Sequence, residues 1–231
     1  MGQVSYNERM VIVHHLNNSR SQRVLWLLEE IGVPYEVKRY ERDAKTMLAP
    51  PALLQVHPLG KSPVIVDGAV TVAESGAIIE YLVDKYGGGR LIPPVGSAQR
   101  LRYTYWLHYA EGSAMPPLLL KLLFTLMPKR APALVRPLVR KVCSQALTVL
   151  VNPQLKLHMA FRESELLKSE WFAGDDFTAA DIQMSFPLEA AAARGGLEQG
   201  HPRAMAFLDR IHARPTYQRA LEKGGPYTVG R

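Results

Sequence analysis

A helix start near residue 74 could bind a small molecule that carries both a carboxylate and an ammonium group. Glu74 and Ser75 stand directly before a segment with helical periodicity. Unpaired backbone N–H groups and the Ser75 hydroxyl can receive a carboxylate there, while Glu74 can accept from an ammonium. A plain helix cap followed by a first-turn acid is the alternative.

A polar turn, Asn17-Asn18-Ser19-Arg20, precedes another expected helix and could stabilise an anion. Its side chains donate hydrogen bonds, and a helix N-terminus favours negative charge. The single cysteine, Cys143, excludes an intrachain disulfide, a CxxC redox pair and a cysteine zinc site. Thiol chemistry at this turn must therefore use the sulfur of a bound molecule.

Alternating strand and helix patterns position both segments in the first part of the chain. The sequence predicts strands at 10–16, 35–40, 62–66 and 69–72, and helices at 21–31, 50–56 and 74–86. Gly32 ends the first helix, and Asp67-Gly68 predicts a two-residue hairpin turn. This βαβαββα order is typical of an open sheet with helices on both faces.

The second part of the chain has helical periodicity throughout. Glycines at 87–89 and prolines at 93–94 indicate a linker over 88–96. Helices are predicted at 97–126, 131–161, 179–193, 203–213 and 217–221. Thr178 can cap the third of these, with Asp181 as its third-position acid. We therefore expect a flexible N-terminus at 1–9, an α/β domain at 10–87, an all-helical domain at 97–223 and a loosely held tail at 224–231.

The formal net charge of +7 is concentrated in the helical part, with eight cations and no acidic residue over 121–162. A solvated helix face, steering of an anionic small substrate and contact with an anionic membrane surface are the alternatives. No zinc-finger spacing or basic and aromatic RNA-binding motif supports nucleic acid. The chain has no apolar run of about 20 residues and no secretion signal, so we expect a cytoplasmic protein.

Four segments together resemble the cytosolic glutathione transferase superfamily, and within it a branch found in fungi and bacteria. They are VHHLNNSRSQRVLWLLEE, RDAKTMLAPPALLQVHPLGKSPVIVDGAVTVAESGAIIEYL, YAEGSAMPPL and FTAADIQMSFPLE. The strongest part of the match is HPLGKSPV followed by AESGAI at this spacing. The resemblance implies a thioredoxin-like N-terminal domain, a helical C-terminal bundle, glutathione as co-substrate without a metal, and a homodimer.

The resemblance also implies where glutathione binds. In thioredoxin-like folds the bond before Pro63 is cis, which exposes the backbone of Ser62 to the cysteine part of glutathione, as in a short antiparallel strand. Glu74 and Ser75 correspond to the residues that hold the γ-glutamyl end. A simple edge proline and a simple helix cap are the alternatives.

The remaining binding positions are less specific. Lys61 pairs with the tripeptide or is solvated, and His57 holds the glycyl carboxylate or caps a helix end. The second-substrate pocket is expected along the first helix of the bundle, at Tyr105, His108, Tyr109 and Met115, with core packing as the alternative. Tyr109 is the expected pocket hydroxyl, and the prolines after Met115 are expected to kink the helix.

The turn after the first strand departs from the family pattern. Relatives place tyrosine, serine or cysteine there to hold glutathione as a thiolate, and their serine or cysteine position falls on Asn18. An asparagine amide can donate a hydrogen bond but cannot act as a nucleophile. Ser19, Asn18 and Arg20 are therefore the candidate partners of the thiolate, with Ser19 favoured slightly over Asn18.

Three functions fit this sequence. The first is conjugation, in which the bound thiolate attacks an electrophilic, hydrophobic substrate. The second is glutathione-dependent disulfide reduction or peroxidase activity. The third is a non-catalytic binding module with the same fold, which the asparagine at position 18 keeps open.

Overall fold

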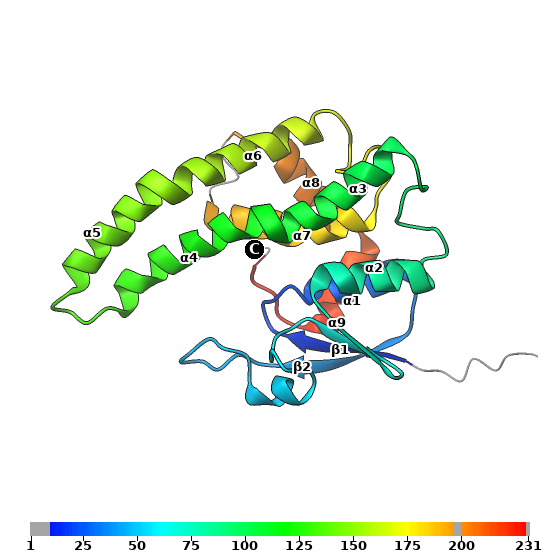
Figure 1. The fold of residues 1–231 in the computed structure, drawn as a ribbon, viewed down its shortest axis with the longest axis horizontal. Coiled ribbons are helices and arrows are strands. Elements are labelled where there is room, and N and C mark those ends of the chain that lie inside the picture. Colours follow the sequence, from blue (N-terminus) through cyan, green and yellow to red (C-terminus); the bar gives the residue numbers. More distant parts are fainter. Residues whose placement is uncertain (1–9, 196–199, 230–231) are drawn as a thin grey trace, which may run out of the picture. The chain divides into compact units, whose positions relative to one another are not determined.

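The computed structural model describes residues 10–195 and 200–229, which form two compact units (Figure 1). The first unit comprises Met1–Ile92 together with His212–Thr228, and the second comprises Pro93–Ile211 with Val229–Arg231. The flexible segment predicted at 1–9 lies outside the described residues. Among the described residues, no helix combines the length and the apolar character needed to cross a membrane.

The first unit is built on a four-stranded mixed sheet in the order β2-β1-β3-β4. Its strands are β1 (Val11–Leu16), β2 (Tyr35–Tyr40), β3 (Val64–Asp67) and β4 (Val70–Ala73). β1 runs parallel to β2 and antiparallel to β3, with Val13 opposite both Val37 and Ile65. Both Val13 and Ile65 are fully buried, so β1 and β3 form the centre of this core.

Helices cover the sheet as the apolar pattern predicted. α1 (Gln22–Ile31) ends at Gly32, whose φ of 80° is the left-handed conformation that glycine adopts at low cost. α2 (Ser75–Tyr86) follows β4. The segment expected as a helix at 50–56 is a short 3-10 helix, Pro51–Gln55. The prolines at its start and Pro58 after it leave room for only one or two turns. In Figure 1 it lies on the face of the sheet opposite α1 and α2.

The β3–β4 hairpin turns one residue later than the sequence predicted. Asp67 pairs with Val70 inside the ladder, so the turn residues are Gly68 and Ala69. Gly68 has a φ of 62°, which suits the first position of a two-residue turn. Asp67 stays in the strand because its buried carboxylate accepts hydrogen bonds from α2, including one of 2.7 Å from the Tyr86 hydroxyl.

Two long helical runs, each interrupted by a π-helical segment, dominate the second unit (Figure 1). The first consists of α3 (Ala98–Tyr109), the π-helix Ala110–Ala114 and α4 (Met115–Arg130); the second consists of α5 (Arg136–Ala146), the π-helix Leu147–Val151 and α6 (Asn152–Leu166). The predicted helices at 97–126 and 131–161 thus exist, with different ends. α4 continues through Pro128, and α5 starts only at Arg136, where Pro137 fits a first turn.

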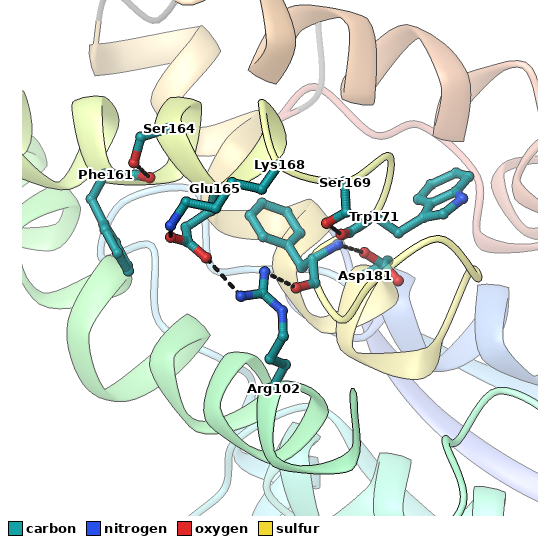
Figure 2. A network of polar contacts seen from close by, with 9 residues as sticks. Arg102, Phe161, Ser164, Glu165, Lys168, Ser169, Trp171 and Asp181 are labelled. Carbon is teal, nitrogen blue, oxygen red and sulfur yellow. Dashed lines mark hydrogen bonds and ion pairs between the residues drawn. The ribbon is translucent and has the colours of Figure 1, made fainter. Parts of the chain in front are cut away.

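The remaining helices are α7 (Ala179–Gly195), α8 (Pro202–His212) and α9 (Pro215–Gly224). The expected capping box of α7 is half formed: Asp181 reaches back, and its Oδ2 accepts from the Thr178 N–H and hydroxyl at 2.8 and 2.9 Å. The Asp181 N–H donates to the Thr178 backbone carbonyl at 3.0 Å and not to its side chain. Asp181 Oδ1 also accepts from the Phe172 N–H at 2.8 Å. Figure 2 shows Arg102 joining this loop to α6: Arg102 donates to the Phe172 carbonyl and pairs with Glu165.

Helix α9 belongs to the first unit, although its periodicity placed it in the helical domain. It packs on α1, where Trp26 meets the Tyr217 ring edge-on at 5.2 Å. The segment after it is also ordered against this unit: Tyr227 is buried, and Thr228 donates two hydrogen bonds to Asn18. The tail predicted at 224–231 thus contacts the first unit at Tyr227 and Thr228, and sequence alone does not show such long-range contacts.

Candidate functional site

The polar turn after β1 is fixed to the sheet by its first residue. The Asn17 N–H donates to the Tyr40 carbonyl at 3.0 Å, which continues the β1–β2 ladder. The Asn17 side-chain oxygen accepts from the Arg42 N–H at 3.0 Å. These bonds hold the turn beside the end of β2 and orient the next three residues.

Asn18 adopts the left-handed conformation, with a φ of 48°. Asparagine tolerates this region better than most residues. Its side-chain oxygen Oδ1 accepts from the Thr228 backbone N–H at 2.7 Å and from the Thr228 hydroxyl at 3.0 Å. Within residues 10–195 and 200–229, the amide nitrogen of Asn18 meets no hydrogen-bond partner, so it remains available as a donor.

Ser19 is buried in a chain of hydrogen bonds. Its Oγ lies 2.7 Å from Ser21 Oγ and accepts from the Ser21 N–H at 3.2 Å. Ser21 Oγ lies in turn 2.8 Å from His15 Nδ1. Ser19 is only 4% exposed, so its hydroxyl reaches a ligand only if this chain rearranges.

The protonation of His15 sets the direction of that chain. Burial, and secondly the positive charge of Arg39, lower the pKa of His15 to about 4, so the ring is neutral at pH 7. The ring also forms a hydrogen bond with the Gly224 backbone. Because Nδ1 faces Ser21, the Nε2–H group donates this bond to the Gly224 carbonyl. Nδ1 must then accept from the Ser21 hydroxyl, and Ser21 accepts from Ser19. The single hydroxyl proton of Ser19 is thereby engaged.

Two guanidinium groups give the turn a positive field. Burial, and secondly the nearby positive charge of Arg20, lower the pKa of Arg42. The Arg42 backbone N–H donates to Asn17 in the turn, and its guanidinium donates to the Met47 carbonyl at 3.1 Å. Like charges kept this close favour a bound anion.

The residues around Pro63 tie two strands together. The Ser62–Pro63 bond is cis, as expected. The Ser62 hydroxyl donates to the His14 carbonyl at 2.7 Å and accepts from the Leu16 N–H at 3.1 Å. Its side chain is thus engaged with β1, and its peptide group is the part that can meet a ligand.

Glu74 and Ser75 form the start of α2. Glu74 is exposed and has a φ of 69°, a conformation that costs a non-glycine residue about 1–3 kcal/mol. Ser75 is buried, and its Oγ accepts from the Arg23 guanidinium at 2.9 Å. Because Ser75 Oγ already accepts from the Arg23 guanidinium, the Ser75 hydroxyl proton can be donated to an anionic ligand.

The two flanking candidates differ in their surroundings. His57 Nδ1 accepts a long hydrogen bond of 3.4 Å from the Leu59 N–H, which lies beyond the short helix, and this leaves the other ring nitrogen available. A helix-end cap would instead donate to one of the last carbonyls of that helix. Lys61 is exposed, and no partner for its ammonium occurs within the part of the chain that the structure describes. It can therefore reach a ligand without breaking an ion pair.

The four residues expected in the second-substrate pocket do not share one environment. Tyr109 and Met115 are buried, whereas Tyr105 and His108 are exposed. Tyr105 stacks on Tyr109 with ring centroids 5.7 Å apart. The Tyr109 hydroxyl lies 2.6 Å from His158 Nδ1, and burial raises its pKa to about 12. The Tyr109 hydroxyl is thus hydrogen-bonded within the helical unit. This environment agrees with the alternative that Tyr109 packs in the core.

The basic stretch 121–162 is not uniformly solvated. Lys129, Arg136 and Arg140 are exposed and line a hollow between α4 and α5 with a volume of about 530 Å³. Arg162 is buried, and its Nε donates to the His158 carbonyl at 3.1 Å. The solvated-face interpretation therefore does not apply to Arg162.

Several residues of the site were missed by the sequence analysis. Arg23 carried a signal, because it follows the apolar spacing of Leu27 and Ile31 along α1 and so places a charge on the buried face. Thr228 carried none, since its partner Asn18 is 210 residues away. A local pattern cannot report such a contact.

The two halves of the chain match two described protein domains. Residues 8–84 match the glutathione S-transferase N-terminal domain, and residues 126–215 match the glutathione S-transferase C-terminal domain. Glutathione S-transferase 3 of Schizosaccharomyces pombe is 37% identical over 215 residues, which cover 93% of this chain and 88% of that protein.

Solved structures show the same fold. A glutathione S-transferase from Actinobacillus pleuropneumoniae is 31% identical with a TM-score of 0.76, and the match covers 96% of each chain. A glutathione transferase family member from Pseudomonas fluorescens, solved with two glutathione molecules bound, is 28% identical with a TM-score of 0.70, over 95% of each chain.

Proposed function

This chain belongs to the glutathione S-transferase family, and from that premise we propose that glutathione lies across the first unit between the turn 17–20 and the start of α2. Two features support this placement. One is the donor-rich turn after β1, and the other is the start of α2, where Ser75 accepts a hydrogen bond from the buried Arg23. Both belong to the same compact unit.

In this placement Ser75 and the first N–H groups of α2 receive the γ-glutamyl carboxylate, and Glu74 accepts from the ammonium. The peptide group of Ser62, before Pro63, pairs with the cysteine backbone, and Lys61 and His57 approach the glycyl carboxylate. We expect Ser75→Ala and Glu74→Gln each to weaken glutathione binding by about 1–3 kcal/mol. Calorimetric titration measures this, and unchanged affinity in both variants would refute the placement.

The thiolate partner is Asn18 rather than Ser19, although the sequence slightly favoured Ser19. The amide nitrogen of Asn18 is an open donor, whereas the Ser19 proton is engaged with Ser21. Arg20 adds positive charge. Hydrogen bonds and nearby cations both favour the charged form of a thiol and so lower its pKa from about 8.5. Ser19 then acts by ordering the turn.

Thiolate absorbance of bound glutathione followed against pH separates these roles. Asn18→Ala should raise the thiol pKa by about one unit, the loss of one hydrogen bond to a charged group. Ser19→Ala should change it less and should lower the melting temperature. A larger pKa change in Ser19→Ala than in Asn18→Ala would return the role to Ser19.

The reaction is conjugation: the thiolate sulfur forms a bond to an electrophilic carbon of a hydrophobic substrate, and with an aryl halide the carbon–halogen bond breaks and halide leaves. This is the chemistry of detoxification. Tyr105 and His108, the exposed members of the expected set, are the proposed second-substrate residues. Purified protein is offered an aryl halide, a hydroperoxide and a mixed disulfide with glutathione in parallel, and the aryl halide should react. Turnover of the disulfide or hydroperoxide alone would favour the reductase or peroxidase, and inactivity despite glutathione binding would favour a binding module.

We further propose a cytoplasmic homodimer, on the basis of the family resemblance. Light scattering should give about twice the chain mass of 25.8 kDa, and a value near one chain mass would contradict the dimer. Cell fractionation with and without salt distinguishes a cytoplasmic protein from one held at an anionic membrane by its basic stretch.

A further inference from the structure

The last residues of the first unit return to the turn that carries Asn18. Helix α9 is held on α1 by ion pairs, including Arg219 Nε to Glu29 Oε2 at 2.7 Å. Beyond α9, the buried side chain of Tyr227 anchors the chain directly before Thr228. The packing of α9 and of the buried Tyr227 ring therefore places Thr228 next to the turn. The contact between Thr228 and Asn18 is part of the packing of this unit.

The contact fixes which way the Asn18 amide points. A backbone N–H can only donate, so the side-chain atom 2.7 Å from the Thr228 nitrogen must be the carbonyl oxygen of Asn18. The Thr228 hydroxyl donates to the same oxygen at 3.0 Å. With its oxygen used twice, the amide turns its nitrogen away from Thr228.

Orientation decides whether this amide can stabilise a thiolate. Its NH₂ group donates to an anion, whereas its oxygen repels one, so a flipped amide would raise the thiol pKa instead of lowering it. The neighbouring hydroxyls do not replace it, because Ser19 and Ser21 are engaged in the chain that ends at His15. The orientation of the Asn18 NH₂ group therefore depends on Thr228, a residue outside the turn.

We propose that Thr228 is a positioning residue for catalysis: it holds the Asn18 amide with its nitrogen presented to the glutathione sulfur. On this basis the C-terminal segment contributes to stabilising the thiolate, through its contact with Asn18. The proposal deepens the function above and rests on glutathione binding beside the turn.

The experiment compares Thr228→Val and Thr228→Ser in the full chain. Valine keeps the backbone N–H and the side-chain shape but removes one of the two hydrogen bonds. We expect Thr228→Val to raise the pKa of bound glutathione by about half a unit, a threefold lower thiolate fraction below that pKa. The kcat should fall about threefold at pH 6.5, with the glutathione KM changed less than twofold. Thr228→Ser should restore the wild-type values.

Two controls show whether the effect passes through Asn18. Thr104→Val makes the same exchange at an exposed threonine whose hydroxyl bonds within its own helix, and it should leave the thiol pKa unchanged. In an Asn18→Ala background, Thr228→Val should have no further effect, because the group that it orients is gone.

The outcomes separate this proposal from the proposed function. A wild-type protein with no thiolate absorbance at saturating glutathione would overturn both. Normal wild-type absorbance with an unchanged pKa in Thr228→Val would overturn the role of Thr228 alone, as would additive effects of Thr228→Val and Asn18→Ala.

Discussion

A buried guanidinium supports the glutathione end of the site. Arg23 is 1% exposed and donates to Ser75 Oγ at 2.9 Å. Arg23→Met keeps the length of the side chain but removes the donor, so Ser75 loses its fixed orientation. We expect glutathione affinity to fall about tenfold, or about 1.4 kcal/mol, by calorimetry.

The double variant tests whether Arg23 acts through Ser75. Ser75→Ala should add little to Arg23→Met, because the two changes remove one coupled unit. The effects would add if Arg23 attracted the ligand only by long-range charge. Urea unfolding of each variant gives the folded fraction, so a loss of affinity from unfolding is recognised.

The neutral ring of His15 predicts an acid-sensitive fold. The pKa of His15 is lowered to about 4, while an unfolded histidine titrates near 6.5. Between these values the unfolded chain binds more protons, so the free energy of unfolding falls as the pH falls from 6.5 towards 4. This residue alone contributes a loss of about 2 kcal/mol between pH 6.5 and pH 4.5.

His15→Asn isolates this contribution, because the amide oxygen can accept from Ser21 but does not titrate in this range. Urea unfolding at several pH values should show a smaller acid loss in the variant than in the wild type. His108→Asn, at an exposed histidine, leaves the buried ring in place and should keep the wild-type slope. Parallel pH profiles of wild type and His15→Asn would contradict the buried neutral ring.

At the scale of elements, the cap of α7 organises the loop shown in Figure 2. Both carboxylate oxygens of Asp181 accept hydrogen bonds, from the Phe172 N–H and from two donors of Thr178. Asp181→Ala leaves these buried donors without a partner, and we expect a loss of about 2–4 kcal/mol of stability in urea unfolding. Asp181→Asn should cost nearly as much, because its NH₂ group would face a donor.

The exposed Asp176 offers a matched control on the same loop. Asp176→Ala should change stability by less than about 0.5 kcal/mol. A mild effect of Asp181→Asn, close to that of the control, would mean that one accepting oxygen suffices for this loop.

Local periodicity predicted most elements because each carries its own pattern, as in α1 with its buried Leu25 and Leu28 before Gly32. It failed where a distant partner decides. The hairpin turn shifted because α2 supplies the groups that keep Asp67 in β3. For the candidate site, the sequence indicated Glu74 and Ser75 but not Arg23, whose distance from Ser75 appears only in the folded chain.

At the scale of the whole molecule, the first unit is discontinuous in sequence. The N-terminal segment supplies the sheet, and residues 212–228 supply α9 and the segment that returns to Asn18. Linkers and periodicity alone assign α9 to the helical domain. A linker pattern shows where the chain leaves the first unit, but it does not show that a later segment packs back onto that unit. The division at 88–96 remains a prediction for the independent folding of each part.

A direct test follows from the position of Trp26. This residue is fully buried beside Tyr217, and its Nε1 donates to Glu30 at 2.9 Å. A fragment of residues 1–92 contains Trp26 as its only tryptophan and lacks α9. We expect it to expose Trp26, with red-shifted fluorescence and no cooperative unfolding, because the apolar face of α1 is uncovered.

Residues 212–228 joined to the same fragment through a flexible linker of about 20 residues should restore a blue-shifted Trp26 emission and a cooperative transition. A linked segment carrying Tyr217→Ala, which removes the ring against Trp26, should restore less. Cooperative unfolding with buried Trp26 in the fragment alone would show that the thioredoxin-like part folds without α9, and the discontinuous unit would then be a packing preference and not a folding requirement.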